Sequence, residues 1–276
     1  MISILVVNHN GRDLLRRCLR ELGNGSAGEG TEVIVADNGS EDGSVAMVRR
    51  EFPGVRLLEL GENLGFGAAN NRAAAVAKGD VLLLLNSDAW PVGDCLGRLR
   101  ERLELDPRVG LVAPELRYED GRPQFAWAPT TGVFGEAIQM ARNPFEAGRW
   151  VHRLRFGLGA GWYTAACVLV RRSAFEQIGG FDEGFFLYFE DVDLCLRLRR
   201  AGWRLAEVRG AVAVHLKGGS QTSERGELEY RRGQLRYYRK HRPAWENALL
   251  RRRLRGKFGA VADGRFRRSL LALLDS

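Results

Sequence analysis

The chain of 276 residues carries a formal net charge of +8, and 45% of its residues are hydrophobic, which predicts a folded protein with a substantial core. The longest apolar run, at residues 81–85, is far too short to cross a bilayer, and the opening residues do not resemble a signal peptide. Four isolated cysteines with apolar neighbours argue against a zinc ribbon and a disulfide framework, so we expect a cytoplasmic protein.

Strands and helices alternate along the first 105 residues of the chain. The strands are expected at residues 2–7, 32–36, 55–60 and 81–85. The helices are expected at residues 12–22, 43–51, 66–78 and 93–105. This alternation implies right-handed crossovers, and therefore an α/β fold with a mainly parallel sheet flanked by helices. Ligands of such sheets bind beyond the carboxyl ends of the strands.

Polar residues gather where each of these four strands ends. Asn8 follows the first strand, Asp37 the second, Asn63 the third, and Asn86 and Asp88 the fourth. Turn chemistry alone favours Asn and Asp in any single loop, but four such loops at one edge of a sheet predict a binding site. The glycine patterns of nicotinamide-binding folds and P-loops are missing from these loops, so neither class is supported.

After residue 114 the regular alternation ends. Prolines and scattered aromatic residues at 115–155 predict loops and short elements. Further elements are expected as a strand at 166–171, a short helix at 173–178 and a strand at 211–214. The segment 225–268 holds 15 Lys and Arg residues against 4 Asp and Glu residues. It predicts a basic helical extension with a surface for phosphates, either of lipid headgroups or of nucleic acid.

An acidic cluster lies inside an apolar run between residues 179 and 202. Its members are Asp182, Glu183, Glu190, Asp191 and Asp193. Carboxylates in apolar surroundings are costly unless they are paired, hydrogen-bonded or bound to a metal. The pattern becomes helical at Glu190, and a helix start needs only one capping acid. Several acids at an apolar wall are more typical of a tuned general base.

Six motifs follow one another along the chain. They are VVNHNG at 6–11, VADNGSEDGS at 35–44, ENLGFGAANN at 62–71, LLNSDA at 84–89, GGFDEGFFLYFEDVDLCLR at 179–197 and HLKGGS at 215–220. In this order they closely resemble the family-2 inverting glycosyltransferases of the GT-A fold, particularly the rhamnosyltransferase-like branch. The resemblance implies a glycosyltransferase domain at 1–222, with a nucleotide-sugar-binding half at 1–114 and an acceptor and catalytic half at 115–222. A basic helical extension at 223–276 would follow.

The resemblance implies that the first four motifs bind a nucleotide-diphosphate sugar. Asn8 and Asp37 would hold the base and ribose, and Asn86 would contact the substrate. The residues expected to close the base pocket are Asn63, Gly65, Phe66 and Asn71. Carboxylates accept hydrogen bonds from base imides and ribose hydroxyls, and glycines let the backbone approach a ligand closely.

The resemblance also implies a metal site. Asp88 ends a motif whose last acid would reach Mg²⁺ or Mn²⁺ on the donor diphosphate. This chain departs from the stricter Asp-x-Asp form and keeps one carboxylate. His215 matches a position that in relatives approaches the metal or the diphosphate, and a structural histidine at a strand end is the alternative.

In the same family pattern, Asp191 matches the catalytic base, which takes the proton of the acceptor hydroxyl as that oxygen attacks the anomeric carbon. Glu190 is the alternative base, although an acceptor-binding or orienting role suits it better. Trp162 and Tyr163 precede the acidic cluster and would stack on a sugar ring, but core packing explains them almost as well.

Together these features predict a glycosyltransferase of cell-surface polysaccharide assembly. The resemblance alone favours dTDP-rhamnose as the donor, with a UDP-linked sugar as the alternative, and a glycan or lipid-linked oligosaccharide as the acceptor. The basic extension either contacts an anionic membrane at the inner face of the cell or packs on the domain as solvated helices. From other classes, a nucleotide-sugar-binding protein without turnover and a nucleic-acid binder are the alternatives. The acid cluster argues against the first, and the lack of an RNA-binding motif against the second.

Overall fold

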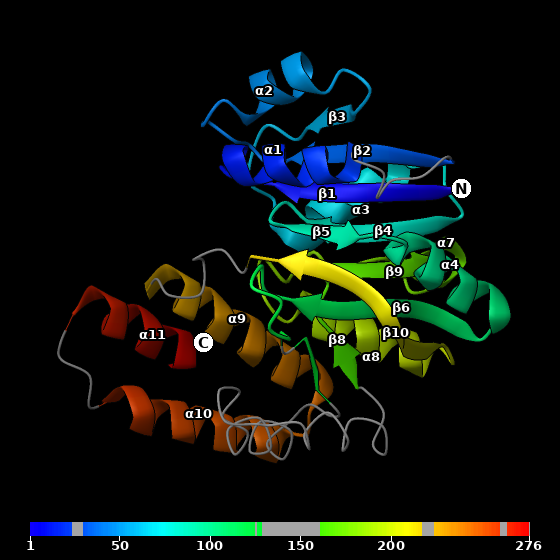
Figure 1. The fold of residues 1–276 in the computed structure, drawn as a ribbon. Helices are drawn as coiled ribbons and strands as arrows, with labels where there is room; N and C mark the ends of the chain where they lie inside the picture. The colour runs from blue at the N-terminus through cyan, green and yellow to red at the C-terminus, as the bar shows by residue number, and fades with distance from the viewer. Residues whose placement is uncertain (24–29, 125, 129–160, 217–223, 260–263, 276) are drawn as a thin grey trace.

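The computed structural model describes residues 1–23, 30–124, 126–128, 161–216, 224–259 and 264–275. Its centre is an eight-stranded sheet in the order β3-β2-β1-β4-β9-β6-β10-β5 (Figure 1). These strands are β1 (Ile2–Asn8), β2 (Thr31–Asp37), β3 (Arg56–Glu59), β4 (Val81–Asn86), β5 (Ala89–Val92), β6 (Val109–Arg117), β9 (Cys167–Arg171) and β10 (Arg204–His215). A two-stranded pair consists of β7 (Trp127–Ala128) and β8 (Trp162–Tyr163).

Nine helices are present in the described part of the chain. They are α1 (Arg12–Glu21), α2 (Ser44–Glu51), α3 (Phe66–Val76), α4 (Cys95–Leu105), α7 (Arg172–Gln177), α8 (Glu190–Arg200), α9 (Glu224–His241), α10 (Ala244–Gly259) and α11 (Arg265–Asp275). None of the helices in these ranges combines the length and the apolar content that crossing a bilayer demands.

Strands β3, β2, β1 and β4 pair in parallel, as the alternation of strands and helices predicts. Beyond them, β9 runs antiparallel to β4 and β6, while β10 is parallel to β6 and antiparallel to β5. The registers that pair Asn8 with Asp37 and Val7 with Asn86 bring the carboxyl ends of three strands to one edge. The predicted α/β fold with a mainly parallel sheet is therefore confirmed.

Helices cover both faces of the sheet because both faces of its strands are apolar. Ile4 and Val6 belong to a buried cluster with residues of α1, α2 and α4. Leu5 and Val7 point to the other face and join a cluster with residues of α3, α7 and α8. The sheet is thus the middle layer of a three-layer arrangement.

Three strands of the eight-stranded sheet differ from the sequence-based expectation, and β5 is one that is not among the predicted elements. No element is predicted at residues 106–113, and the alternation ends after Pro114, yet β6 extends from Val109 to Arg117. Strand β6 pairs with β9 only at Leu111 and Val112. Pro114 lies beyond this pairing, so the backbone N–H that proline lacks is not needed for a hydrogen bond to β9. Strand β10 begins at Arg204 rather than at residue 211, and a bulge between Val208 and Val212 hides its alternation.

The predicted C-terminal helices are present and pack beside the acidic segment. Figure 1 shows α9, α10 and α11 gathered below the sheet. Tyr237 and Tyr238 of α9 are buried in a third core cluster, together with Leu250 of α10 and Phe185 of the acidic segment. Most apolar residues of the basic extension therefore pack inside the protein.

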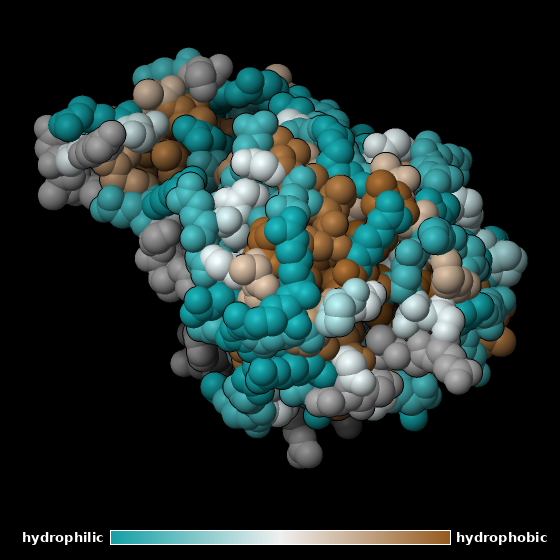
Figure 2. Space-filling view, turned by 90° about the horizontal axis from the view of Figure 1, so that it is seen from above, coloured by the Kyte–Doolittle hydropathy of each residue, from teal (hydrophilic) through white to brown (hydrophobic). Residues whose placement is uncertain are grey.

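The edge of the sheet at β3 and α2 is visible from above in Figure 2. Polar side chains dominate this face, and hydrophobic side chains show mainly in a central area between them. Strand β3 is only four residues long and begins and ends with the exposed residues Arg56 and Glu59. A short, charged edge strand resists pairing with other chains.

Candidate active site

A buried polar group forms where β1 and β2 end. The amide of Asn8 donates hydrogen bonds to Asp37 Oδ2 and Ser40 Oγ, both at 3.1 Å. Asp37 Oδ1 accepts the backbone N–H of Ser40 at 2.9 Å. Asn8 is fully buried, and its Oδ1 has no hydrogen-bond partner among the described residues. A buried acceptor without a donor costs about 1–3 kcal/mol, so this oxygen suits a ligand N–H such as a base imide.

The loop after β3 is held against this group by Asn38, which sequence reasoning did not single out. The Asn38 amide donates to Asn63 Oδ1 at 2.9 Å and to the carbonyl of Gly65 at 3.2 Å, and its Oδ1 accepts the Leu64 N–H at 2.9 Å. Asn38 directly follows Asp37 in its motif, and that position is the one signal that sequence offers. The predicted residues Asn63 and Gly65 thus lie beside the Asn8–Asp37 group.

Gly65 also brings the acidic segment close. Its φ of +88° favours glycine, and a Cβ there would overlap the carbonyl oxygen of Phe186. That same carbonyl accepts the backbone N–H of Phe66 at 3.0 Å. The loop after β3 and the acidic segment are therefore in direct backbone contact.

Phe66 and Asn71 make their described contacts with the acidic segment. The ring of Phe66 packs edge-on against Phe181, with centroids 5.9 Å apart. The Asn71 amide donates to the carbonyl of Phe181 and to Glu183 Oε1, both at 3.0 Å, and accepts the Phe181 N–H at 2.9 Å. Both residues thereby hold the acidic segment against α3. That they also close a base pocket stays a prediction.

Asp88 and His215 face each other across the ends of β4 and β10. Asp88 Oδ1 lies 3.3 Å from His215 Nε2, and the Asn86 amide nitrogen lies 3.5 Å from the same ring nitrogen. On the other side of the ring, Gln124 Oε1 lies 2.8 Å from His215 Nδ1, while the Gln124 amide donates to the His215 carbonyl at 2.6 Å. Gln124 is a site residue that sequence reasoning missed, because it lies in a stretch interpreted as loops.

These contacts fit a divalent cation. The donation from the Gln124 amide to the His215 carbonyl turns Gln124 Oε1 toward Nδ1. In the tautomer that donates from Nδ1 to this oxygen, Nε2 presents its lone pair on the side of Asp88. Nε2 and the Asp88 carboxylate are then two acceptors 3.3 Å apart. A carboxylate oxygen and an imidazole nitrogen are both ligands that a divalent cation can use. Among the described residues, no group of three or more His, Cys, Asp or Glu side chains supplies a fuller ligand set, so a bound ion would also need ligand or water oxygens.

The backbone is strained where the acidic segment enters α8. Tyr188 and Phe189 have φ values of 67° and 68°, in the left-handed region that non-glycine residues seldom adopt. Two such residues in succession cost free energy and are typical of functional sites. This turn places Glu190 and Asp191 in the first turn of α8, as the sequence predicts.

Glu190 and Asp191 occupy unlike surroundings. Glu190 is 6% exposed, and its Oε2 has no hydrogen-bond partner among the described residues. Burial, and then the charge of Asp191, raises the pKa of Glu190 well above its ordinary value. Burial also raises the pKa of Asp191, but N–H groups of Val192, at 2.8 Å, and Ala165, at 3.4 Å, oppose this rise. Adjacent carboxyl groups of this kind can divide roles, with one protonated and the other ionised.

The other acids of the cluster are ion-paired. Asp193 is fully buried and accepts from Arg197 at 2.6 Å and Lys240 at 2.7 Å, and His241 Nε2 lies 2.6 Å away. Asp182 binds the same Lys240 at 2.6 Å. Burial opposes ionisation of Asp182, yet hydrogen bonds led by that of Lys240 lower its pKa to about 2. Asp182 and Asp193 therefore join the segment to α9.

The two aromatic candidates differ in exposure. Tyr163 is 6% exposed within the core, where its backbone N–H and carbonyl both contact Cys195 Sγ, so core packing accounts for it. Trp162 is half-buried between two core clusters, and its stacking on a sugar stays a prediction. Residues 217–220 of the last motif and 157–160 before Trp162 lie outside the described residues.

Comparisons with known proteins agree with this architecture. A family model described as glycosyl transferase family 2 matches residues 3–179. The chain is 37% identical over 207 residues to the N-acetylglucosaminyl-diphospho-decaprenol L-rhamnosyltransferase of Mycobacterium tuberculosis, covering 68% of this chain and 67% of the relative. It is 27% identical over 226 residues to the rhamnosyltransferase WbbL of Escherichia coli, covering 78% of this chain and 83% of the relative.

Solved structures show a similar fold. The mannosyltransferase PcManGT from Pyrobaculum calidifontis, in complex with GDP-Man and Mn²⁺, superposes with a TM-score of 0.64 at 20% identity, covering 99% of this chain and 74% of that chain. GalNAc-T7, with UDP, GalNAc and Mn²⁺, gives a TM-score of 0.59 at 18% identity, over 84% of this chain and 47% of that chain. Likeness at this identity concerns the fold alone.

Proposed function

Because the chain belongs to glycosyl transferase family 2, we propose that it is an inverting rhamnosyltransferase. It moves L-rhamnose from dTDP-rhamnose to a hydroxyl of a lipid-diphosphate-linked sugar in cell-surface polysaccharide assembly. The names of the two curated rhamnosyltransferases support the sugar, and that of the mycobacterial relative supports the acceptor class. The observation that carries the proposed chemistry is the pair of carboxyl groups with unlike surroundings at the start of α8.

In this reaction the acceptor oxygen forms a bond to the anomeric carbon as the bond from that carbon to the diphosphate breaks. Asp191, the ionised member of the pair, takes the proton of the acceptor hydroxyl, and dTDP leaves with the electron pair. Glu190 stays protonated because burial and the charge of Asp191 disfavour its ionised form, and it orients the acceptor. At the donor, the unpartnered Asn8 Oδ1 accepts the imide N–H of the thymine base.

Product analysis tests this function directly. The protein is incubated with undecaprenyl-diphosphate-linked N-acetylglucosamine and, in parallel, with dTDP-rhamnose or UDP-linked hexoses. Mass spectrometry is expected to show the addition of one deoxyhexose from dTDP-rhamnose alone. Transfer only from a UDP-linked donor would show that the donor is not dTDP-rhamnose. Binding of the donors without any transfer would favour a non-catalytic binding protein.

We also propose that Asp88 and His215 hold Mn²⁺ or Mg²⁺ on the donor diphosphate, where the cation offsets the charge that develops on the leaving group. The Asp88 oxygen and the His215 ring nitrogen that face each other support this assignment, as do the Mn²⁺ ions of the structurally similar transferases. In the variant Asp88→Asn, the Mn²⁺-dependent part of dTDP binding should weaken about tenfold or more, since one of two protein ligands is lost. Calorimetry with and without Mn²⁺ measures this effect. Full transfer activity in excess EDTA, with no metal found by elemental analysis, would contradict it.

A peripheral membrane contact is the remaining part of the proposal, and the exposed face of α10 supports it. Trp245 and Leu249 are 56% and 44% exposed, and their spacing of four residues places them on one face. Arg252 follows on the same face and is exposed. An exposed Trp and Leu beside basic residues suit the interface of an anionic bilayer. By contrast, Arg231, Arg232, Arg236 and Lys240 of α9 pair with acids of the protein.

The double variant Trp245→Ser with Leu249→Ser should lower partitioning into anionic vesicles about tenfold or more, because burial of each side chain contributes about 1.5–3 kcal/mol. Co-sedimentation at low and high salt measures this, and salt should weaken the binding of the wild type. Leu105→Ser is the matched control, because Leu105 is 72% exposed but lies on α4. Equal binding of the wild type and the double variant, or equal binding to neutral and anionic vesicles, would contradict a membrane contact through α10. The basic helices would then have a structural role only.

A further inference from the structure

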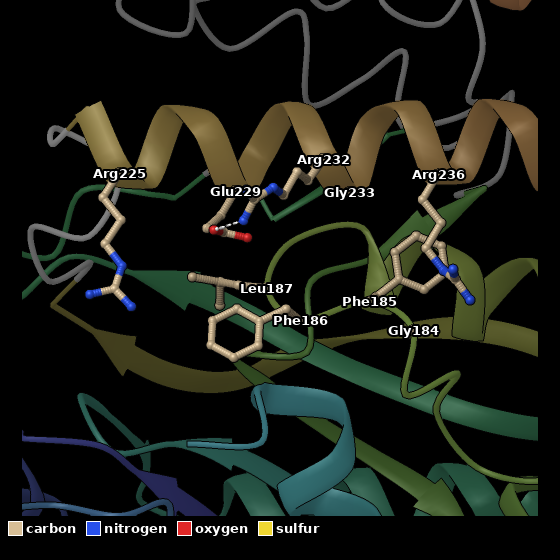
Figure 3. A pocket seen from close by; sticks show the side chains of 9 residues that line it. All are labelled: Gly184, Phe185, Phe186, Leu187, Arg225, Glu229, Arg232, Gly233 and Arg236. Atoms are coloured by element: carbon tan, nitrogen blue, oxygen red, sulfur yellow. Dashed lines mark hydrogen bonds and ion pairs between the residues drawn. The ribbon is translucent and has the colours of Figure 1, made fainter. Parts of the chain in front are cut away.

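A cavity of about 390 Å³ lies between the acidic segment and α9 (Figure 3). One side consists of the consecutive residues 184–187, and the other consists of α9 side chains. The α9 residues that line it are Arg225, Glu229, Arg232, Gly233 and Arg236. None of the residues assigned above to the donor, the metal or the proton transfer lines it, so its chemistry is not yet accounted for.

Three guanidinium groups line this cavity against one carboxylate. Arg232 and Arg236 follow Arg225 by seven and eleven residues, which places all three on one face of the helix. The buried Glu229 pairs with Arg232 at 2.7 Å, and Arg236 pairs with Asp182 at 2.9 Å. Arg225 has no ion pair with another residue of the described chain. An anion in the cavity would therefore meet at least one guanidinium whose charge is not compensated.

Phe186 and Leu187 supply an apolar wall. In Figure 3 both side chains lie opposite α9, and the guanidinium group of Arg225 extends toward them. The Phe186 carbonyl accepts the N–H of Phe66, which lies next to the loop proposed to bind the nucleotide. Glu190 follows Leu187 by only three positions in the sequence. The cavity thus combines cations with an apolar surface. The segment that lines it contacts Phe66 on one side and leads to Glu190 on the other.

We propose that this cavity binds the diphosphate of the lipid-linked acceptor. The guanidinium groups hold phosphate oxygens through paired N–H donors, and Phe186 and Leu187 contact the first apolar units of the lipid. This inference rests on the proposed function, because it identifies the part of that acceptor which the protein holds. The donor diphosphate is assigned to a cation at Asp88 and His215 at the strand ends, so the acceptor diphosphate requires a separate site with positive charge.

Arg225→Gln is the variant that tests the cavity with the least disturbance. Substitution of Arg232 would leave the buried Glu229 without its ion pair, and substitution of Arg236 would remove the pair with Asp182. Arg239→Gln is the matched control. Arg239 is exposed on the same helix and carries the same charge, but it does not line the cavity.

Isothermal titration calorimetry of the full chain with farnesyl diphosphate, inorganic pyrophosphate and dTDP provides the test. The Kd for farnesyl diphosphate should rise about tenfold or more in Arg225→Gln and stay within about twofold of wild type in Arg239→Gln. The affinity for dTDP should be unchanged in both variants. Pyrophosphate should bind the wild type more weakly than farnesyl diphosphate, because it leaves the apolar wall unoccupied.

Three results would overturn the proposal. Unchanged farnesyl diphosphate binding in Arg225→Gln would exclude the cavity, and a parallel loss of dTDP binding would make it part of the donor site. Pyrophosphate binding as tight as that of farnesyl diphosphate would exclude a lipid ligand. Calorimetry needs no turnover, so farnesyl diphosphate binding with these variant effects, together with a lack of rhamnosyl transfer, would refute the proposed function alone.

Discussion

Asp191→Asn is expected to lower kcat for sugar transfer by at least about a hundredfold, the usual scale for loss of a general base. The substitution keeps the size of the side chain and one oxygen, which can still accept the Val192 N–H. Only the longer contact from the Ala165 N–H, which goes to the second carboxylate oxygen, is lost. It removes the carboxylate that takes the acceptor proton. Binding of dTDP, measured by calorimetry, should stay near that of wild type because the Asn8–Asp37 group is unchanged.

Glu190→Gln is the matched variant of the neighbouring carboxyl group. In the proposed mechanism Glu190 is protonated and neutral, and glutamine preserves that charge and a hydrogen-bond donor. We therefore expect a loss in kcat below about tenfold, smaller than the loss of a general base. If Glu190→Gln lost more activity than Asp191→Asn, the two roles would be reversed.

The pH dependence of kcat/KM follows from the same pair. Burial raises the pKa of Asp191 above the ordinary aspartate value of 3.8, although backbone N–H groups limit this shift. Because the base acts in its ionised form, kcat/KM of the wild type should fall as the pH decreases through this raised pKa. The acidic limb should therefore lie above the ordinary aspartate range, and the residual activity of Asp191→Asn should lack it. A wild-type profile that stays flat down to pH 3.8 would contradict a base with a raised pKa.

Local patterns in the sequence were enough to predict the strands and helices of the first 105 residues. Strands β1 to β4 and the helices between them have regular periodicity, so their expected bounds differ from the observed ones by only a few residues. The polar strand ends could be placed together because carboxyl ends of parallel strands share an edge. The metal candidates Asp88 and His215 lie 3.3 Å apart although 127 positions separate them in the sequence.

Other parts of the site depend on contacts that periodicity does not report. Asn38 resembles a turn residue in the sequence, and its bonds to the Asn63–Gly65 loop become visible only in three dimensions. Gln124 lies beyond Pro114, where alternation is lost, yet it fixes the ring of His215. The acidic cluster could be recognised as unusual, but the ion pairs of Asp182 and Asp193 depend on α9, which follows Asp191 by more than 30 residues.

The C-terminal helices illustrate the same limit. Their positive charge predicts a surface that binds phosphates, but in the structure their residues have different surroundings. Lys240 bridges Asp182 and Asp193, Arg225 faces a cavity, and Trp245 is exposed on α10. The net charge of the segment cannot distinguish these surroundings, because they depend on which acid or apolar surface each side chain contacts.

The strongest effect on stability is expected from Asp193→Asn, which should lower the free energy of unfolding at pH 7 by about 3 kcal/mol. Asp193 is fully buried, and its carboxylate binds Arg197 of α8 together with Lys240 and His241 of α9. An amide would leave these groups without their common anion and weaken the attachment of α9 to the acidic segment. Urea denaturation followed by circular dichroism measures the loss.

Glu183→Gln is the control for this variant, because Glu183 is an acid of the same segment but is exposed and pairs with Arg72 at the surface. An exposed ion pair contributes about 0–1 kcal/mol, so a small change is expected. Burial opposes ionisation of Asp193, but hydrogen bonds from His241 and Lys240 bring its pKa below 3.8. Its contribution to stability is therefore complete above that value and decreases as the pH falls through the lower native pKa. The difference between wild type and Asp193→Asn should thus be large at pH 7 and shrink on acidification, whereas equal losses in Asp193→Asn and Glu183→Gln would show that the buried network is not what holds α9 in place.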